Sequence, residues 1–102
     1  MPIQSYNPTT MSLEQEFVYD DKQHSEKKLA ASQGAFAQWR TLPFSDRASL
    51  LLRAAVLLEE RKERYAVIMA REMGKPVSTG MNEITKCAWV CRYYAEHAES
   101  LL

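Results

Sequence analysis

The sequence of residues 43–76 is PFSDRASLLLRAAVLLEERKERYAVIMAREMGKP, and it predicts one long helix with both ends marked. At the start, the Ser45 hydroxyl can accept a hydrogen bond from the free N–H groups of the first turn, and Asp46 suits the positive end of the helix dipole. At the end, Gly74 can adopt the left-handed conformation that closes a helix, and Pro76 cannot continue one.

This long helix is predicted to be amphipathic. Apolar residues recur at three- and four-residue steps along it and form one face that needs a partner: Leu51, Ala54, Ala55, Leu58, Tyr65, Ile68 and Met69. The opposite face is charged and is interpreted as solvated: Arg53, Glu60, Arg61, Arg64 and Arg71. Glu60 and Arg64 have the spacing of a weak surface ion pair.

The length and composition of the chain limit the classes of function that are expected. The chain has 102 residues, enough for one small core but fewer than most cofactor enzymes need, and its 13 basic and 13 acidic residues give a formal net charge of zero. Nucleic-acid-binding and anionic-membrane-binding proteins usually carry a basic excess. The 46% hydrophobic share is ordinary, and no apolar run resembles a membrane span or a signal peptide. A cytoplasmic protein with reduced cysteines is expected, without nucleic-acid or membrane partners.

Residues 1–20 are predicted to form an extended hairpin arm. Ile3–Tyr6 has the character of a short strand, and Asn7-Pro8 provides turn chemistry because proline disfavours a helical conformation at the residue before it. Apolar residues then alternate over 13–19, which predicts a second strand. Two strands alone are marginal in water, so this arm needs a larger surface to lie on.

Residues 21–102 are predicted to be helical. A first helix begins near Asp21 or Ser25, either of which can cap it. The spacing of its apolar residues places Leu29, Phe36 and Ala37 toward a core. Gly34 lowers helix stability by about 1 kcal/mol relative to alanine, which suggests that another backbone passes close to it.

A final helix is predicted after Gly74. One seam along it consists of residues at alternating steps of three and four: Met81, Ile84, Ala88, Cys91, Ala95, Ala98 and Leu102. Its small residues allow a close helix crossing. Trp89 and Tyr93 project from another side, and three helices offer nothing to cover them.

No residue of this chain is predicted to act in catalysis, cofactor binding or metal binding. Cys87 and Cys91 lie one helical turn apart, but His97 would point elsewhere, and zinc needs three or four convergent ligands. A disulfide within one helix is also geometrically poor. The two cysteines are interpreted as small apolar residues in a helix interface.

Four residues are predicted to have structural roles: Arg47, Gly74, Lys75 and Pro76. Lys75 follows a helix C-terminus, where a cation complements the helix dipole. Phosphate binding by Lys75 is the alternative, but the surrounding loop lacks the backbone donors that such a site normally adds.

Five blocks in order carry a resemblance to a known family: Asn7-Pro8-Thr9; Ala35-Phe36 with Trp39; Arg47 with Leu50-Leu51; Glu72-Met73-Gly74-Lys75-Pro76; and Glu83 with Lys86-Cys87-Ala88-Trp89 and Tyr93-Tyr94-Ala95-Glu96. Together they resemble the amino-terminal part of NAD(P)-dependent aldehyde dehydrogenases, and among these the succinate-semialdehyde dehydrogenases. The chain departs from the family pattern at Thr9-Thr10-Met11, where the usual turn has a glycine.

The resemblance implies a mainly α piece of the α/β aldehyde dehydrogenase fold: about three amphipathic helices and an N-terminal β-hairpin. In the family, the nucleophilic cysteine, the general-base glutamate and the cofactor-binding glycine stretch come later in the chain, so this chain alone is expected to be inactive and to bind no cofactor. Residues 21–102 would cover the cofactor domain. Arg47 matches a family arginine, to which structural pairing with carbonyls or carboxylates is assigned.

Two hypotheses follow. In the first, the chain is the N-terminal fragment of an aldehyde dehydrogenase that oxidises an aldehyde to an acid with NAD or NADP, and its partner is the remainder of that enzyme. In the second, it is a stand-alone helical interaction or oligomerisation module without enzymatic activity. Both predict that the bare chain self-associates through its uncovered apolar faces. A reading frame that continues past Leu102 would support the first, and a stop codon there the second.

Overall fold

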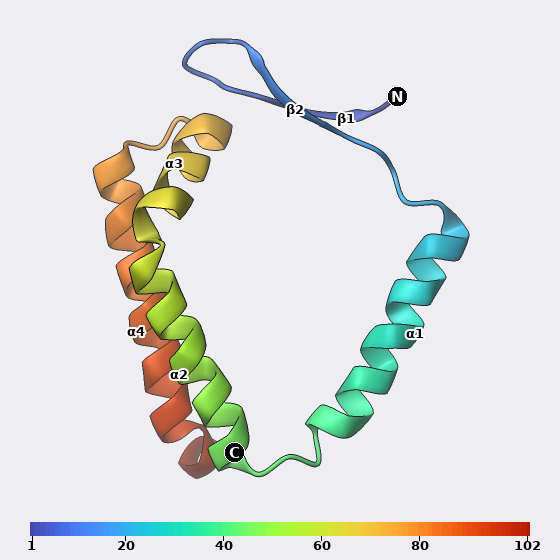
Figure 1. The fold of residues 1–102 in the computed structure, drawn as a ribbon, viewed down its shortest axis with the longest axis vertical. Coiled ribbons are helices and arrows are strands. Elements are labelled where there is room, and N and C mark those ends of the chain that lie inside the picture. The colour runs from blue at the N-terminus through green and yellow to red at the C-terminus, as the bar shows by residue number, and fades with distance from the viewer.

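The computed structural model describes all residues from 1 to 102. The elements in order are strands β1 (Ile3–Tyr6) and β2 (Leu13–Phe17), then helices α1 (Lys22–Trp39), α2 (Phe44–Glu60), α3 (Lys62–Met73) and α4 (Val77–Leu101). The predicted fold class, mainly α with an N-terminal β-hairpin, is confirmed (Figure 1). The number of helices is four because the expected long helix is divided in two.

The hairpin is antiparallel and irregular. Ile3 pairs with Phe17 and Tyr6 with Leu13, with a register shift between Ser5 and Tyr6. β2 ends two residues before the predicted end of the second strand. In the turn, the side-chain oxygen of Asn7 accepts hydrogen bonds from the backbone N–H groups of Thr9, at 2.9 Å, and Thr10, at 3.3 Å. Met11 takes a positive φ of 60°.

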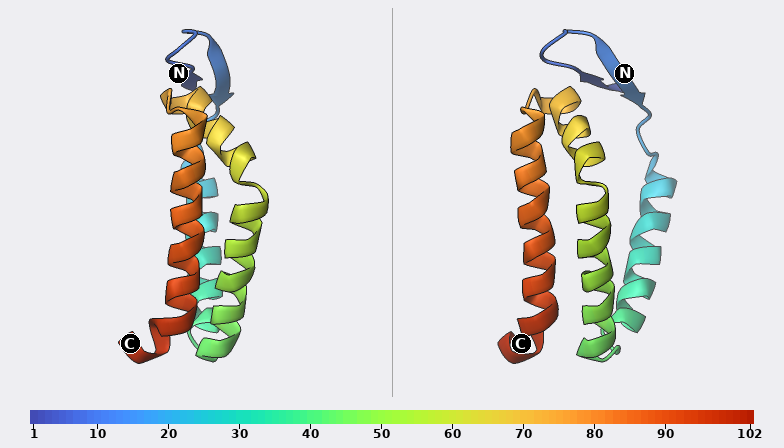
Figure 2. Two further views of the ribbon diagram at one scale, coloured as in Figure 1. Left: turned by 90° about the vertical axis from the view of Figure 1, so that its left-hand side faces the viewer. Right: turned by 60° about the vertical axis from the view of Figure 1, so that its left-hand side comes forward.

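Helix α1 begins as the sequence predicts but does not pack as predicted. The Asp21 carboxylate caps it by accepting from the His24 backbone N–H at 2.7 Å. No residue of α1 is buried, and Leu29 and Phe36 are 70% and 54% exposed. The core assigned to these residues is therefore absent from this chain. Nothing lies within 4 Å of a Cβ placed on Gly34, so the expected close approach there is wrong. Figures 1 and 2 show α1 standing away from the other helices.

The prediction of one helix across residues 43–76 is wrong. Arg61, with φ −111° and ψ 13°, separates α2 from α3, although no glycine or proline marks the break. The helix also begins one residue before Ser45: Pro43 is its N-cap, and the Ser45 hydroxyl lies 3.4 Å from Asp46 Oδ1 instead of capping the backbone. The predicted stop is confirmed, since Gly74 has φ 72°.

The break at Arg61 has two consequences. Glu60 and Arg64 no longer belong to one continuous helix, and the predicted ion pair between them does not form. The helix axis also changes direction, so that α2 runs along α4 while α3 leans across the start of α4 (Figure 2).

Small side chains build the core. The buried residues are Ala55 of α2, Ala66 of α3, and Gly80, Ile84 and Ala88 of α4. The seam predicted for the last helix is confirmed at Ile84 and Ala88, which are both buried. Because the core contains little bulk, the helices approach closely and much apolar surface stays outside. None of the four helices combines the length and the hydropathy that a membrane-spanning segment requires.

Candidate functional site

The Gly74–Pro76 link connects α3 to α4 and also contacts the β-hairpin. A Cβ on Gly74 would lie 3.1 Å from Pro8 Cγ, so the tip of the hairpin rests on the end of α3. Pro76, with φ −55°, is the N-cap of α4, and its carbonyl accepts the first helical hydrogen bond from Gly80 N at 3.0 Å. These positions fit the structural roles predicted for both residues, because Gly74 supplies a left-handed turn and Pro76 a fixed φ.

Lys75 lies between these two residues and has a partner that sequence reasoning missed. Its ammonium group donates to Glu83 Oε2 across the α3–α4 turn. The Lys75 ammonium is thus paired within the chain, and the structural role assigned to Lys75 stays a prediction. No sequence rule pairs these positions, because they are eight positions apart and Lys75 lies in the turn that precedes the helix of Glu83.

Arg47 does not make the predicted pairing with carbonyls or carboxylates within this chain. Its guanidinium carbon lies 4.3 Å from the centre of the Phe44 ring, one turn earlier in α2. Its Nε is buried and has no hydrogen-bond partner. A buried N–H without an acceptor is unfavourable by about 1–3 kcal/mol, so this edge of the guanidinium is unsatisfied here.

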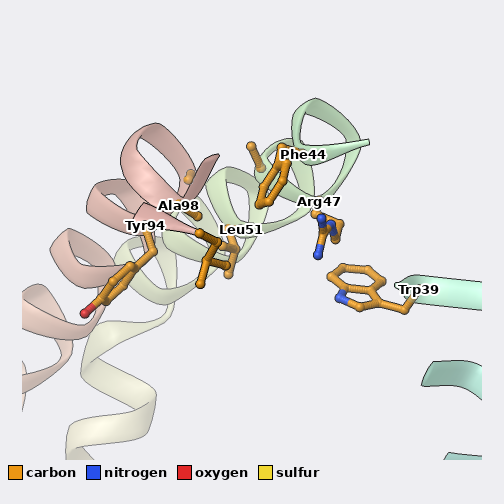
Figure 3. A pocket seen from close by; sticks show the side chains of 9 residues that line it. Trp39, Phe44, Arg47, Leu51, Tyr94 and Ala98 are labelled. Atoms are coloured by element: carbon orange, nitrogen blue, oxygen red, sulfur yellow. The ribbon is translucent and has the colours of Figure 1, made fainter. Parts of the chain in front are cut away.

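Arg47 borders a small apolar cavity of about 150 Å³ at the end of the α2–α4 pair (Figure 3). Its lining comes from α1, α2 and the C-terminal part of α4: Trp39, Phe44, Arg47, Ala48, Leu51, Tyr94, Ala95, Ala98 and Leu102. The Trp39 ring lies across from Arg47 in this view. The cavity offers apolar walls and one cation, but it contains no nucleophile, general base or metal ligand set.

The cysteines form no reactive site. Cys87 is exposed and Cys91 is partly exposed, so the predicted interface position fits Cys91 better than Cys87, which was placed wrongly. His97 Nδ1 lies 2.8 Å from the Tyr93 carbonyl, which requires this nitrogen to carry the proton. No group of three or more potential ligands is brought together that could hold a metal.

Two further ion pairs lie at the surface of the molecule. Arg92 of α4 donates to Glu59 of α2 at 2.6 Å and links these helices, although the two residues are 33 positions apart in sequence. Lys28 donates to Asp20 at 2.5 Å at the base of α1. This hydrogen bond, aided by the charges of His24 and Lys28, lowers the pKa of Asp20 below its usual value, against a smaller opposing effect of desolvation.

An uncovered apolar surface is the dominant feature of the molecule. The accessible area is 8125 Å², whereas a compact monomer of this mass would expose about 5,900 Å². The radius of gyration is 17.7 Å, against about 13 Å for a compact domain of this length. Trp89 and Tyr93 of α4 are 60% and 38% exposed, as the sequence predicted.

Comparison with known proteins explains this open shape. The model of the aldehyde dehydrogenase family matches residues 1–102, the whole chain. The chain belongs to the aldehyde dehydrogenase family. Its fold agrees with this membership: a structure of Gox0499, studied for cofactor and substrate selection, superposes on 100% of this chain and 23% of its own length, with a TM-score of 0.95 and 27% identity.

The relatives of this aldehyde dehydrogenase segment are much longer than the segment itself. A probable NADP+-dependent succinate-semialdehyde dehydrogenase from Synechocystis is 39% identical over all 102 residues, which are 22% of the relative. An NADP+-dependent succinate-semialdehyde dehydrogenase from Mycobacterium tuberculosis is 36% identical over the same share. The succinic semialdehyde dehydrogenase of Streptococcus pyogenes, solved with NADP+, superposes on 97% of this chain and 22% of its own, with a TM-score of 0.90 and 27% identity. The chain thus spans about a fifth of the relatives that it matches.

Proposed function

We propose that this chain is the amino-terminal segment of an NADP-dependent succinate-semialdehyde dehydrogenase and that it serves as the helical cover of the enzyme's cofactor domain. The reaction of the whole enzyme would then be the oxidation of succinic semialdehyde by water to the acid, with NADP+ as the hydride acceptor. In this proposal the present segment performs no chemical step.

The observation that carries the proposal is the match of fold and sequence over the whole length of the chain. Relatives named as NADP+-dependent succinate-semialdehyde dehydrogenases match it end to end, and one such enzyme was solved with NADP+. NADP is therefore preferred to NAD. The cytoplasmic location expected from the sequence stays a prediction.

The uncovered surface supports the same proposal. An excess of about 2,200 Å² over a compact monomer is in the range that one partner loses in a large permanent interface. Much of this surface is apolar, including Leu29 and Phe36 on α1. Apart from Trp39 at its end, which lines the cavity, this helix of 18 residues has little tertiary packing and no buried side chain, so α1 is expected to acquire its packing from a catalytic body.

Complementation tests the proposal. The Synechocystis relative is expressed without the segment equivalent to this chain, the present chain is added, and NADPH formation from succinic semialdehyde is followed. We expect neither part to be active alone and the mixture to regain activity. Phe36→Asp, which puts a carboxylate in the apolar stripe of α1, should prevent this recovery. Lys27→Asp introduces the same group on the opposite side of α1 and should not.

Two results would contradict the proposal. One is aldehyde oxidation by the purified chain alone after full-length enzyme has been rigorously removed. The other is complementation that proceeds equally with Phe36→Asp and Lys27→Asp, which would show that the α1 stripe covers nothing.

A stand-alone interaction module is the second candidate, and the same apolar surface favours it. Its expected behaviour is stable self-association and no rescue of a truncated enzyme. A reading frame that continues past Leu102 into a cofactor-binding region would decide against it.

A further inference from the structure

Arg47 is a partly buried cation without an anionic partner. Of the seven arginines in the chain, only Arg47 and Arg92 are partly buried, and the other five are exposed. Arg92 has a carboxylate partner, because it donates to Glu59 at 2.6 Å. No carboxylate of the chain, the terminal one at Leu102 included, lies within 4 Å of a nitrogen of Arg47. The structure therefore leaves the charge of this guanidinium uncompensated.

The hydrogen-bond donors of Arg47 also lack acceptors. The Phe44 ring, 4.3 Å from the guanidinium carbon, attracts the cation through one face but does not serve the N–H groups in the guanidinium plane. The side chain of Arg47 donates no hydrogen bond to any group of the chain. Of its three nitrogens, only Nε is closed off from the surface, so the two terminal nitrogens can receive an acceptor from outside.

The cavity beside Arg47 has room for one apolar side chain. Its volume is about 150 Å³, and Arg47 is the only charged residue in its lining. A cavity of this size with apolar walls can hold a group as large as benzene. In Figure 3 Arg47 lies at one side of this cavity, near Phe44 and Trp39. A partner that fits here needs an apolar group close to a hydrogen-bond acceptor.

We infer that this cavity is a docking site for the rest of the enzyme, which places one apolar side chain in the cavity and pairs a neighbouring Asp or Glu carboxylate with the terminal nitrogens of Arg47. Docking buries the guanidinium further, and a buried charge is strongly unfavourable unless an opposite charge compensates it. The acceptor is therefore a carboxylate, whose two oxygens match two parallel N–H groups of a guanidinium. The inference rests on the proposed function, because its partner is the remainder of that enzyme.

The position of the cavity fits this partner. Leu102, the last residue of the chain, is one of the lining residues. In the proposed enzyme the chain continues from Leu102, so the residues that follow begin beside the cavity. The segment matches 22% of the length of the Synechocystis relative, so most of such an enzyme is available to supply the apolar side chain and the carboxylate.

Calorimetric titration tests the ion pair. The Synechocystis relative, expressed without the segment equivalent to this chain, is titrated with the full chain and with its Arg47→Met variant. The substitution should raise the dissociation constant by about 30-fold or more, because it leaves the partner's carboxylate buried and unpaired. Arg53→Met removes an exposed guanidinium from the same helix and should leave the constant within about threefold.

The isolated chain provides the contrast. Without the partner's carboxylate, Arg47→Met should not lower the midpoint of urea unfolding, so the cost of the substitution should be confined to the complex. Arg47→Gln is a second variant, which keeps a donor without the charge and should weaken binding by about tenfold or more. Circular dichroism checks that each variant retains its helix content.

The outcomes separate this inference from the proposed function. A truncated relative that does not bind even the wild-type chain would overturn both. Binding of the wild-type chain, with Arg47→Met and Arg47→Gln each within threefold of it, would overturn the ion pair alone.

Filling the cavity tests its apolar part. Ala98→Leu adds bulk at the cavity wall and should weaken binding of the truncated relative by about tenfold or more, because the partner's side chain no longer fits. Ala31→Leu makes the same change on α1, on the side opposite its apolar stripe, and should have no effect. Equal affinities of the two variants would show that no side chain enters the cavity.

A crystal structure of the complex identifies the acceptor. We expect an Asp or Glu oxygen of the partner within about 3 Å of a terminal nitrogen of Arg47. A backbone carbonyl at this place, with no carboxylate beside it, would contradict the inferred ion pair.

Discussion

Gly80 of α4 lies directly against Ala66 of α3. A Cβ on Gly80 would be 3.0 Å from Ala66 Cβ and 3.1 Å from its Cα. Both residues are fully or nearly fully buried, so neither backbone can relax into solvent. This contact sets how closely α3 crosses α4, and the absence of a side chain at position 80 permits it.

Gly80→Ala is therefore expected to destabilise the chain. The new methyl group would force two packed helices apart, which costs about 1–3 kcal/mol and outweighs a gain of about 1 kcal/mol in helix propensity. Gly34→Ala is the matched control, because nothing lies within 4 Å of its Cβ; it should stabilise by about 0.5–1 kcal/mol. Urea unfolding at a fixed chain concentration measures both. Equal responses at the two glycines would contradict the close crossing.

Gly74→Ala should weaken the α3–α4 turn for two separable reasons. The left-handed φ of 72° disfavours a side chain by about 1–2 kcal/mol, and the added Cβ would lie 3.1 Å from Pro8 Cγ. Adding Pro8→Ala to Gly74→Ala should recover the steric part and leave the conformational part. The four unfolding free energies of this cycle provide the measurement, and a complete recovery would show that the φ value carries no cost.

The Lys75–Glu83 pair should contribute modestly to stability. Both side chains are partly exposed, so a double-mutant cycle with Lys75→Met and Glu83→Gln should give a coupling of about 0.2–1 kcal/mol. The coupling should shrink in 1 M salt, where the Debye length is about 3 Å. A coupling that survives high salt unchanged would mean that hydrogen bonding, and not charge, maintains the pair.

Arg47→Met is expected to leave the isolated chain unchanged or to stabilise it by up to about 1 kcal/mol. The substitution loses the stacking of the guanidinium on Phe44, worth about 0.5–1 kcal/mol at such sites, but it also removes the buried Nε that has no acceptor. Arg53→Met, at an exposed position of the same helix, is the control. A loss above about 1 kcal/mol specific to Arg47 would show that an acceptor for Nε exists within the chain.

Asp20 should titrate below the usual carboxyl range because Lys28 donates to its charged form. A depressed pKa in the folded state means that the contribution of this carboxylate is present above its ordinary pKa of 3.8 and is lost as the pH falls through the folded value. Carbon-detected NMR titration of the Asp20 carboxyl group reads the shift directly. Lys28→Met should bring the pKa back toward 3.8, and an unchanged pKa in this variant would refute the assigned cause.

The elements that the sequence predicted well are those with local physical signals. Asp21 caps α1, Gly74 ends α3 and Pro76 begins α4, because capping and turn chemistry act within a few residues. Spacing alone predicted the seam of α4 at Ile84 and Ala88, but it wrongly extended the seam to Leu102, which is 92% exposed. The hairpin followed from alternation and the turn at Asn7-Pro8, with an error of two residues at the end of β2.

The predictions that were wrong concern features that depend on tertiary packing. No local signal marks the break at Arg61, where the sequence has neither glycine nor proline, and the bend accompanies the crossing of α3 over α4. The apolar stripe of α1 was identified, but which surface covers Leu29 and Phe36 cannot be derived from spacing. Two helical glycines illustrate the same limit: Gly34 and Gly80 are indistinguishable by sequence pattern, yet only Gly80 lies against another backbone.

The isolation of α1 determines where this chain is most vulnerable. An unsupported helix of 18 residues is only slightly longer than the lengths of about 12–15 at which isolated helices become marginal in water, so it opens far more often than α2 or α4. Its amides should exchange with deuterium first, and proteases should cleave there before elsewhere. Protection of α1 from both would report directly, residue by residue, that a partner has docked on it.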